Sequence, residues 1–296
     1  MTPPSSGAAH ADAPQYAPLS VAAFPWESKA AFPYILIFAC AFLFSYHLAD
    51  IRPQVFFEAE GRRNIARFVT DMFPPELSWN FLTLIAPAVR ETLQIALLGT
   101  VGAVVIGFPL GLIATASVTW SGVLHAAVAS RSRRMLAFGL YSCARGVLSV
   151  LRSIPELIWA LVFVRAIGLG AFAGALAIGV AYGGILGKVY SEILESIDPD
   201  PIEALQATGA TKLTIIFYGF LPVALPHLVA YTLYRWECAI RASAILGFVG
   251  AGGIGQQIEI SMRMFNFHEV LTLIGILAAL VAGVDLISAR IRKAVL

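Results

Sequence analysis

Charged side chains lie inside the apolar segments of this 296-residue chain, and three of them share one long apolar run: Arg235, Glu237 and Arg241. A charge at membrane depth costs free energy, so such a residue is by default a functional candidate. Guanidinium groups hold oxyanions through paired hydrogen bonds. Arg235 or Arg241 could therefore offset the negative charge of an anion that passes between apolar helices. Other ionisable residues in apolar surroundings are Arg145, Arg165, Lys188 and Asp285.

A structural interpretation of the same charges stays open. Glu237 and Arg241 are four residues apart, in the order that favours an ion pair along one helix, so Glu237 could simply neutralise Arg241 for packing. Arg152 and Glu156 have the same spacing and flank Pro155, where an ion pair would brace a break in a helix. These alternatives predict charges that hold helices together instead of charges that meet a solute.

A polar, alanine-rich segment stands between two apolar runs at Glu203–Pro222, EALQATGATKLTIIFYGFLP. The preceding Asp198-Pro199-Asp200-Pro201 predicts a helix start, because Asp caps helices and Pro suits their first turn. Gly209 predicts a break in this helix, and Leu221-Pro222 predicts a stop before the next apolar run. The sequence thus predicts a short helix-turn-helix, although an ordinary amphipathic helix at the membrane interface would show the same pattern.

Motifs of nucleotide-binding and metal enzymes are missing or lack their context. Gly250–Gly255 (GAGGIG) satisfies GxGxxG, but it follows an apolar span instead of a strand, and Asp285 is too distant to bind a ribose. We expect these glycines to allow close helix packing or a bend. The five His are scattered, and the three Cys lie in apolar runs without metal-ligand spacing. We therefore predict no catalytic group, no metal site and no nucleotide site in this chain.

The composition around these residues is that of an integral membrane protein. Hydrophobic residues make up 58% of the chain and charged residues only 13%, whereas soluble proteins carry about 25% charged residues. The net charge of +2 gives no reason to expect nucleic-acid binding. Because a spanning helix needs about 20 apolar residues, we expect six spans, near 31–49, 92–117, 135–165, 171–188, 223–246 and 268–288. The third is too long for one span, so we expect a break at Pro155 that leaves one span and a shorter helix.

This pattern divides the chain into three regions. Residues 1–30 form a flexible tail of Ala, Pro and Ser, residues 31–91 hold the first transmembrane helix and an extracytoplasmic segment, and residues 92–296 form the main transmembrane domain with the polar loop 198–222. Basic residues collect on the cytoplasmic side of membrane proteins. The clusters that decide the orientation are Arg131, Arg133 and Arg134 between two spans, and Arg290, Arg292 and Lys293 near the C-terminus. We expect both termini and the polar loop to be cytoplasmic.

The polar loop resembles the cytoplasmic EAA loop of ABC-importer permeases. The matching positions are Glu203, Ala204, Leu205, Gly209, Leu221 and Pro222. In that family the loop forms a coupling helix that docks into a cleft on the ATPase subunit, so the resemblance implies that these residues couple the chain to an ATPase. Two positions depart from the family pattern, since Leu205 replaces the second Ala and Gly219 stands where Ile is usual.

The resemblance extends over about residues 90–293 and is to the phosphonate-transporter branch of these permeases. The stretches that carry it are Glu91–Thr100 (ETLQIALLGT), Arg152–Leu161 (RSIPELIWAL), Tyr231–Glu237 (YTLYRWE) and Gly247–Gly255 (GFVGAGGIG). That branch imports phosphonates, and close relatives carry phosphite or hypophosphite. The implied fold is an all-α integral membrane protein with about six transmembrane helices and a cytoplasmic coupling helix, the type I ABC importer permease.

The resemblance also implies partners. A permease of this family forms the translocation pathway as a homodimer, with two ABC ATPase subunits and a periplasmic or lipid-anchored phosphonate-binding protein, in the lipid bilayer of the bacterial inner membrane. ATP and Mg would bind to the ATPase subunits, and no cofactor to this chain. With such a substrate, Arg235, Glu237 and Arg241 become candidate residues of the anion pathway.

Two other functions stay open at this point. The first is an ABC-importer permease for another small solute such as an amino acid, because the soluble binding protein selects the substrate. The second is a membrane-embedded enzyme, which would need convergent catalytic groups that the scattered His residues do not supply. ATPase activity that arises only when a partner chain is added would separate a transporter from an enzyme.

Overall fold

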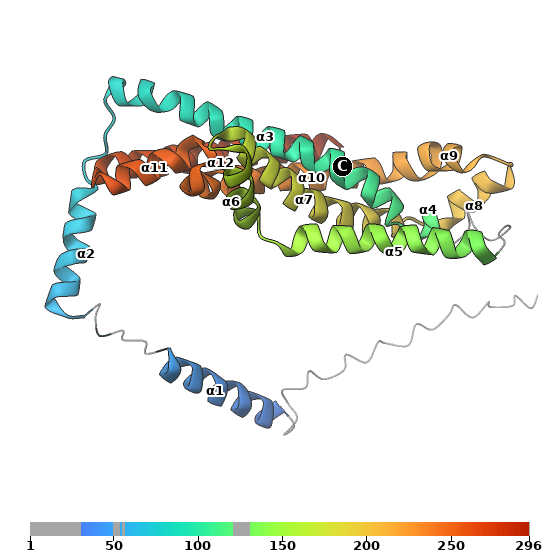
Figure 1. The fold of residues 1–296 in the computed structure, drawn as a ribbon, viewed down its shortest axis with the longest axis horizontal. Helices are drawn as coiled ribbons and strands as arrows, with labels where there is room; N and C mark the ends of the chain where they lie inside the picture. Colours follow the sequence, from blue (N-terminus) through green and yellow to red (C-terminus); the bar gives the residue numbers. More distant parts are fainter. Residues whose placement is uncertain (1–30, 50–53, 55–56, 121–130, 296) are drawn as a thin grey trace, which may run out of the picture. The chain divides into compact units, whose positions relative to one another are not determined.

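The computed structural model describes residues 31–49, 54, 57–120 and 131–295 (Figure 1). The tail predicted at residues 1–30 lies outside the described residues. Regular structure in the described part of the chain is helical throughout, as expected. The chain divides into two compact units, residues 1–65 and 66–296. The first unit holds α1 (Ala31–Leu48), an apolar helix at the position of the first predicted span.

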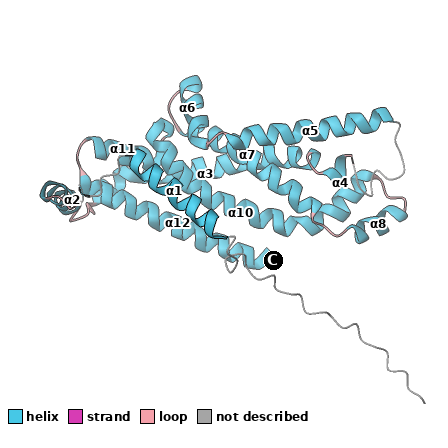
Figure 2. Ribbon diagram, turned by 90° about the horizontal axis from the view of Figure 1, so that it is seen from below, coloured by secondary structure: helices cyan, strands magenta, loops and turns pink. Residues whose placement is uncertain are grey.

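The second unit is a bundle of helices (Figures 1 and 2), and α2 (Ala59–Asp71) joins the two units in sequence. The bundle contains α3 (Trp79–Ile113), α4 (Ala116–Thr119), α5 (Arg131–Ser153), α6 (Glu156–Ile167), α7 (Ala171–Glu195), α8 (Pro199–Ala207), α9 (Lys212–Ile215), α10 (Leu221–Leu246), α11 (Gly253–Arg263) and α12 (Phe267–Val295). Two π-helical turns, η4 (Ile216–Phe220) and η5 (Gly247–Ala251), flank α10.

Five helical segments of the described chain are long and apolar enough to cross a membrane, and α1 is a shorter apolar helix. These segments match the positions of the six predicted spans. The predicted break in the third span is confirmed, because α5 ends at Ser153 and α6 begins at Glu156 with Pro155 between them. The sequence therefore predicted the order of the spans correctly.

The helix bounds differ from prediction where polar residues extend an apolar core. The second span, expected at 92–117, is α3 and begins at Trp79, so the domain boundary predicted at residue 91 falls inside a helix. Ser78 caps this start, since its Oγ accepts a hydrogen bond from the Phe81 N–H at 3.3 Å. Hydrogen bonds from Ser78 also lower the pKa of the exposed Glu76 carboxyl just outside the helix. α12 likewise runs to Val295, so Arg290 lies in a helix and not in a solvated tail.

The centre of the bundle is α7. Of the residues in its most apolar stretch, 67% are buried, against 39% or fewer in the other spans. α3, α5, α6 and α10 pack around it (Figure 2). Small residues permit this close approach: a Cβ atom on Gly107 of α3 would lie 2.8 Å from the Gly183 carbonyl oxygen and 2.9 Å from the Gly187 nitrogen. Glycine therefore lets the α3 and α7 backbones touch.

A sharp bend separates α10 from α11 at the glycine-rich run, as we expected. Gly252 and Gly253 have φ values of 88° and 75°, a backbone region that favours glycine. The first N–H groups of α11 then meet α3, because Glu91 Oε2 accepts from Gly253 N at 2.8 Å and Thr92 Oγ1 accepts from Ile254 N at 2.8 Å. These side chains satisfy donors that a helix start leaves unpaired. The glycine-rich run thus forms the bend that joins α10 to α11 and docks the start of α11 on α3.

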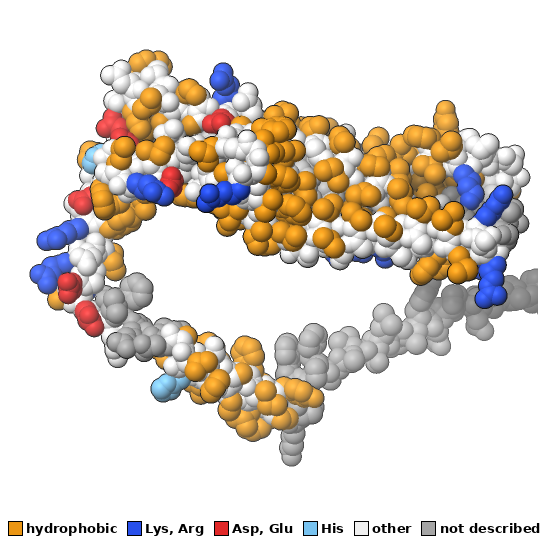
Figure 3. All heavy atoms as spheres, in the orientation of Figure 1, with side chains coloured by type: hydrophobic (Ala, Val, Ile, Leu, Met, Phe, Trp, Pro, Cys, Tyr) orange, Lys and Arg blue, Asp and Glu red, His pale blue; other side chains and the backbone are white. Residues whose placement is uncertain are grey.

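The surface of the bundle suits a membrane. On the face drawn in Figure 3, apolar side chains cover the middle of the bundle, and most charged side chains lie nearer its two ends. Large apolar side chains point outward from several spans, among them Leu98, Val105, Val150 and Leu286. An apolar surface of this extent would be unstable in water and is stable against lipid.

Candidate functional site

α8 forms as the sequence predicted. Asp198 caps it, with its Oδ1 accepting from Asp200 N at 3.1 Å, and Pro199 occupies the first turn. Ile202 is buried at 2% exposure and fixes one face of α8 against the protein. Glu203 and Ala204 are exposed on another face, and Leu205 is half-buried. α8 is therefore an anchored helix with a free surface.

The turn after α8 is the predicted glycine break. Gly209 has a φ of +78°, and no atom lies within 4 Å of the position its Cβ would take. Thr211 then caps α9, its Oγ1 accepting from Thr214 N at 3.3 Å. Further on, a Cβ on Gly219 would lie 2.9 Å from Ile202 Cδ1. The glycine at the position where Ile is usual therefore makes room for α8 to pack on η4.

The stop predicted at Leu221-Pro222 is wrong. The helix continues without interruption from Lys212 to Leu246, through α9, η4 and α10. Pro222 lies in the first turn of α10, directly after the π-helical turn η4. A proline lacks the N–H that an α-helix needs, and a π-type turn shifts the hydrogen-bond pattern so that the chain can stay helical. α9 is thus part of the same rod as α10.

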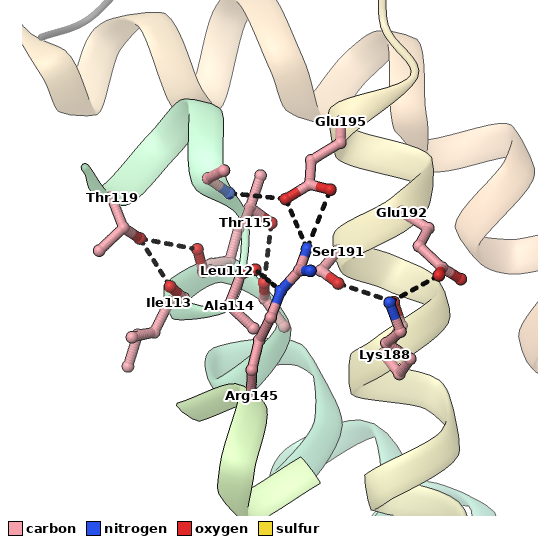
Figure 4. A network of polar contacts seen from close by, with 12 residues as sticks. Leu112, Ile113, Ala114, Thr115, Thr119, Arg145, Lys188, Ser191, Glu192 and Glu195 are labelled. Carbon is pink, nitrogen blue, oxygen red and sulfur yellow. Dashed lines mark hydrogen bonds and ion pairs between the residues drawn. The ribbon is translucent and has the colours of Figure 1, made fainter. Parts of the chain in front are cut away.

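A polar network lies at the end of α7 that precedes α8 (Figure 4). Arg145 of α5 donates from Nη2 to both oxygens of Glu195, at 2.8 and 3.0 Å, and from Nε to the Ala114 carbonyl oxygen at 3.1 Å. Glu195 Oε1 also accepts from Ala116 N at 2.7 Å. The network joins α3, α4, α5 and α7, and neighbouring Lys188 pairs with Glu192 at 2.6 Å. Arg145 and Lys188 therefore hold the helices together. Lys188 and Glu192 are four residues apart in one helix. The partner of Arg145 lies in a different helix, so spacing along the sequence could not predict it.

Arg235 is held by aromatic rings. Its guanidinium carbon lies 5.4 Å from the Tyr182 ring centroid, 5.5 Å from that of Tyr231 and 5.8 Å from that of Tyr234. The Tyr231 hydroxyl oxygen accepts hydrogen bonds from Arg235 Nε at 3.1 Å and Nη2 at 3.0 Å. Among the described residues no carboxylate forms an ion pair with Arg235. The positive charge of Arg235 is thus stabilised by three tyrosine rings and by the Tyr231 hydroxyl, and no negative charge of the described residues cancels it.

The expected pair between Glu237 and Arg241 does not form. Glu237 is buried and its Oε1 accepts from Arg292 Nη1 of α12 at 2.7 Å. Glu237 faces α12, while Arg241, one turn further along α10 and rotated by about 40°, is exposed. Within the described residues, the hydrogen bond that the Arg241 side chain makes is to Cys238 Sγ at 3.4 Å. The pair predicted between Arg152 and Glu156 is also absent among the ion pairs of the described chain.

The other ionisable candidates lie apart from this region. Arg165 is exposed near the end of α6. Asp285 belongs to α12, and its Oδ1 is buried without a hydrogen-bond partner among the described residues. The structure therefore leaves two unneutralised charges on α10, those of Arg235 and Arg241.

A bundle of apolar spans with a capped helix inserted between two of them is the architecture expected of a membrane permease subunit. The chain belongs to the family of binding-protein-dependent transport system inner membrane components, whose profile matches residues 107–295. It is 35% identical over 233 residues to the phosphite transport system permease protein PtxC of Stutzerimonas stutzeri, covering 79% of this chain and 78% of that one. It is 32% identical over 237 residues to the phosphate-import permease protein PhnE of Mycolicibacterium smegmatis, covering 80% of this chain and 41% of the relative.

A solved structure confirms the expected fold. The chain superimposes on a subunit in the inward facing MetNI methionine ABC transporter with a TM-score of 0.61 and 27% identity, covering 74% of this chain and all of the other. The fold is that of a type I ABC importer permease.

Proposed function

We propose that this chain forms the translocation pathway of an ATP-driven importer for a phosphorus oxyanion such as phosphonate, phosphite or hypophosphite. The observation that carries the proposal is α8, which exposes Glu203 on a helix anchored by Ile202 and connected to the spanning helix α10 through one continuous rod. A force on α8 would therefore act on a helix of the pathway. The names of the phosphite and phosphate relatives support the substrate class.

ATP hydrolysis belongs to a separate chain in this proposal. The sequence has no Walker motif, and its GxGxxG run is used in the bend before α11. Two ABC ATPase subunits would bind ATP and Mg and receive α8 of two permease copies, through Glu203, Ala204, Leu205 and Gly209, with Leu221 and Pro222 in the rod behind them. A periplasmic or lipid-anchored binding protein would deliver the substrate. The permease then needs no cofactor and no catalytic group of its own.

The anion would meet the positive charges of α10. Arg235 and Arg241 have no carboxylate partner among the described residues. An uncompensated charge in a spanning helix costs free energy, and such a residue is therefore a candidate contact for a solute. Glu237 is bound to Arg292, so we propose no direct contact between Glu237 and the anion. The binding protein supplies affinity, and the two arginines lower the electrostatic barrier to passage.

We also propose an orientation with both chain termini and α8 in the cytoplasm. Arg131, Arg133 and Arg134 in the first turn of α5, and the basic residues at the end of α12, then lie on the cytoplasmic side. Cysteine labelling of intact cells with a membrane-impermeant reagent tests this orientation. A substitution Thr208→Cys should stay unlabelled until the membrane is opened.

The substrate is tested in cells that lack this chain and regain it on a plasmid. We expect growth on phosphite or methylphosphonate as the sole phosphorus source to depend on the chain. The likeness to the methionine transporter favours a second candidate, an amino-acid importer. Uptake of labelled methionine that depends on the chain, without growth on either phosphorus source, would favour that candidate and contradict the proposal.

A further inference from the structure

A cavity lies between α7 and α10, at the end of α7 from which α8 begins. Its volume is about 490 Å³, larger than a small phosphorus oxyanion needs. Ser196, which ends α7, is part of its wall, and Asp198 caps α8 two residues later. The lining residues are Val189, Ile193, Ser196, His227, Ala230, Tyr231 and Tyr234.

Two walls of this cavity also hold Arg235. Tyr231 and Tyr234 line the cavity, and their ring centroids lie 5.5 and 5.8 Å from the Arg235 guanidinium carbon. The Tyr231 oxygen accepts two hydrogen bonds from Arg235, at 3.1 and 3.0 Å. A phenol has one proton to donate, and a guanidinium has only donors. The Tyr231 proton is therefore left for another acceptor, and the adjacent positive charge makes that hydroxyl a stronger donor.

We propose that this cavity is a binding site for a small phosphorus oxyanion, in which the Tyr231 hydroxyl donates a hydrogen bond to the ion and Arg235 supplies the charge behind it. The identity of the ion rests on the proposed function. With α8 on the cytoplasmic side, the site lies at the inner end of the pathway, where an imported ion leaves the permease. It is distinct from any contact that Arg241 makes on the exposed face of α10.

The chemistry of the walls indicates weak binding. Val189, Ile193 and Ala230 offer no hydrogen bond, and Arg235 acts through a phenol instead of a direct bidentate contact. We therefore expect a dissociation constant on the order of 1 mM. A site this weak releases its ion readily, as the exit of an importer requires.

The test uses the purified permease with its ATPase subunits and without the binding protein, so that binding to the permease alone is seen. Phosphorus NMR line broadening of added phosphite reports fast exchange with the complex. We expect Tyr231→Phe to weaken phosphite binding about tenfold, because it removes one charge-assisted hydrogen bond. Tyr218→Phe is the control, since it removes a phenol hydroxyl from an exposed side chain of η4 that does not line the cavity. We expect binding to the Tyr218→Phe complex to stay within about twofold of wild type.

Each other outcome overturns the inference. Unchanged broadening with Tyr231→Phe, or an equal loss with both variants, removes the assignment of the Tyr231 hydroxyl as the donor to the ion. No broadening with the wild-type complex, in a transporter that still supports growth on phosphite, removes the site and leaves the proposed function standing. Failure of growth on phosphite and methylphosphonate contradicts the proposed function itself. Retained ATPase subunits in the purified complex show that each variant is folded.

Discussion

At the scale of single residues, the charges on α10 have different partners. Glu237 binds Arg292 from α12, and Arg235 lies among three tyrosine rings. Arg241 is exposed, and among the described residues its side chain hydrogen-bonds to the sulfur of Cys238. Charge alone cannot tell these three residues apart. Their surroundings assign Glu237 to structure and leave Arg235 and Arg241 as the residues that we propose to meet the anion.

Arg241→Ala should lower transport of the phosphorus oxyanion more than Arg290→Ala does. Arg241 lies within a spanning helix, and one lost charge-assisted contact with the ion corresponds to about tenfold in rate. Arg290 is exposed near the end of α12, where loss of a charge has little effect. Because Glu237 pairs with Arg292, Arg241→Ala leaves no buried carboxylate unpaired. Equal uptake by the two variants, at equal membrane abundance, would leave Arg241 without a role in the pathway.

Arg292→Ala should destabilise the permease. It leaves Glu237, whose side chain is 8% exposed, buried without its partner, at a cost of about 2–4 kcal/mol. Arg290→Ala, two positions away on the same helix, should cost about 0.5 kcal/mol or less. Thermal unfolding of the purified variants in detergent measures the difference. If Glu237→Gln added to Arg292→Ala brings no recovery of the unfolding temperature, the unpaired carboxylate is not the cause.

The sequence could point to these residues but not to their partners. Spacing of four residues finds pairs within one helix, whereas Glu237 and Arg292 belong to different helices and lie 55 positions apart. Arg145 and Glu195 are another pair of this kind. Such partners follow from how helices pack, which a single sequence does not display. Tyr231 and Arg235 are four residues apart in one helix, so the sequence alone permits the prediction of their contact.

At the scale of elements, α8 and its turn were predictable because their signals are local. Asp198, Pro199 and Gly209 act on the few residues beside them. The uninterrupted helix from Lys212 to Leu246 was not predictable, because a proline usually ends a helix and here a π-turn accommodates it. The sequence did not predict that α3 begins as early as Trp79. A run of apolar residues shows which part of a helix crosses the membrane, but the helix can extend beyond that run.

Gly209→Val should uncouple the permease from its ATPase. The φ of +78° at this position costs a β-branched residue about 2 kcal/mol or more, so the turn would rearrange and α8 would shift. Gly209→Asn is the control, because Asn tolerates this backbone region. The measurement is co-purification of the ATPase subunits together with substrate-stimulated ATP hydrolysis. Wild-type values for Gly209→Val in both assays would mean that α8 and its turn are not the coupling element.

Gly107→Ala should loosen the centre of the bundle. The new methyl group would lie 2.8 Å from a backbone oxygen of α7, so α3 and α7 would have to separate, at a cost of about 1–3 kcal/mol. Gly102→Ala on the same helix should be tolerated, since its methyl group would lie 3.6 Å from the nearest atom. Unfolding temperatures in detergent compare the two. Equal unfolding temperatures of the two variants would show that α3 and α7 can separate without loss of stability.

At the scale of the whole molecule, we propose that one chain supplies half of a pathway. Type I importers place two permease subunits side by side, and this chain carries one set of spans and one α8. We propose that the second set comes from a second copy. The exposed Arg241 would then lie where two copies meet. Contact with lipid would be unfavourable for its charged guanidinium group. The assembly stays a prediction that rests on the family resemblance, since no local pattern in the sequence gives the contacts between copies.

We propose that this permease moves a phosphorus oxyanion when a separate chain hydrolyses ATP. The most direct measurement is uptake of labelled phosphite and methylphosphonate into proteoliposomes that hold the permease, the ATPase subunits and the binding protein. We predict accumulation that requires ATP and all three components, and no ATP hydrolysis by the permease alone. Accumulation without ATPase subunits, hydrolysis by the isolated permease, or ATP-driven uptake of methionine with neither phosphorus compound taken up would contradict the account.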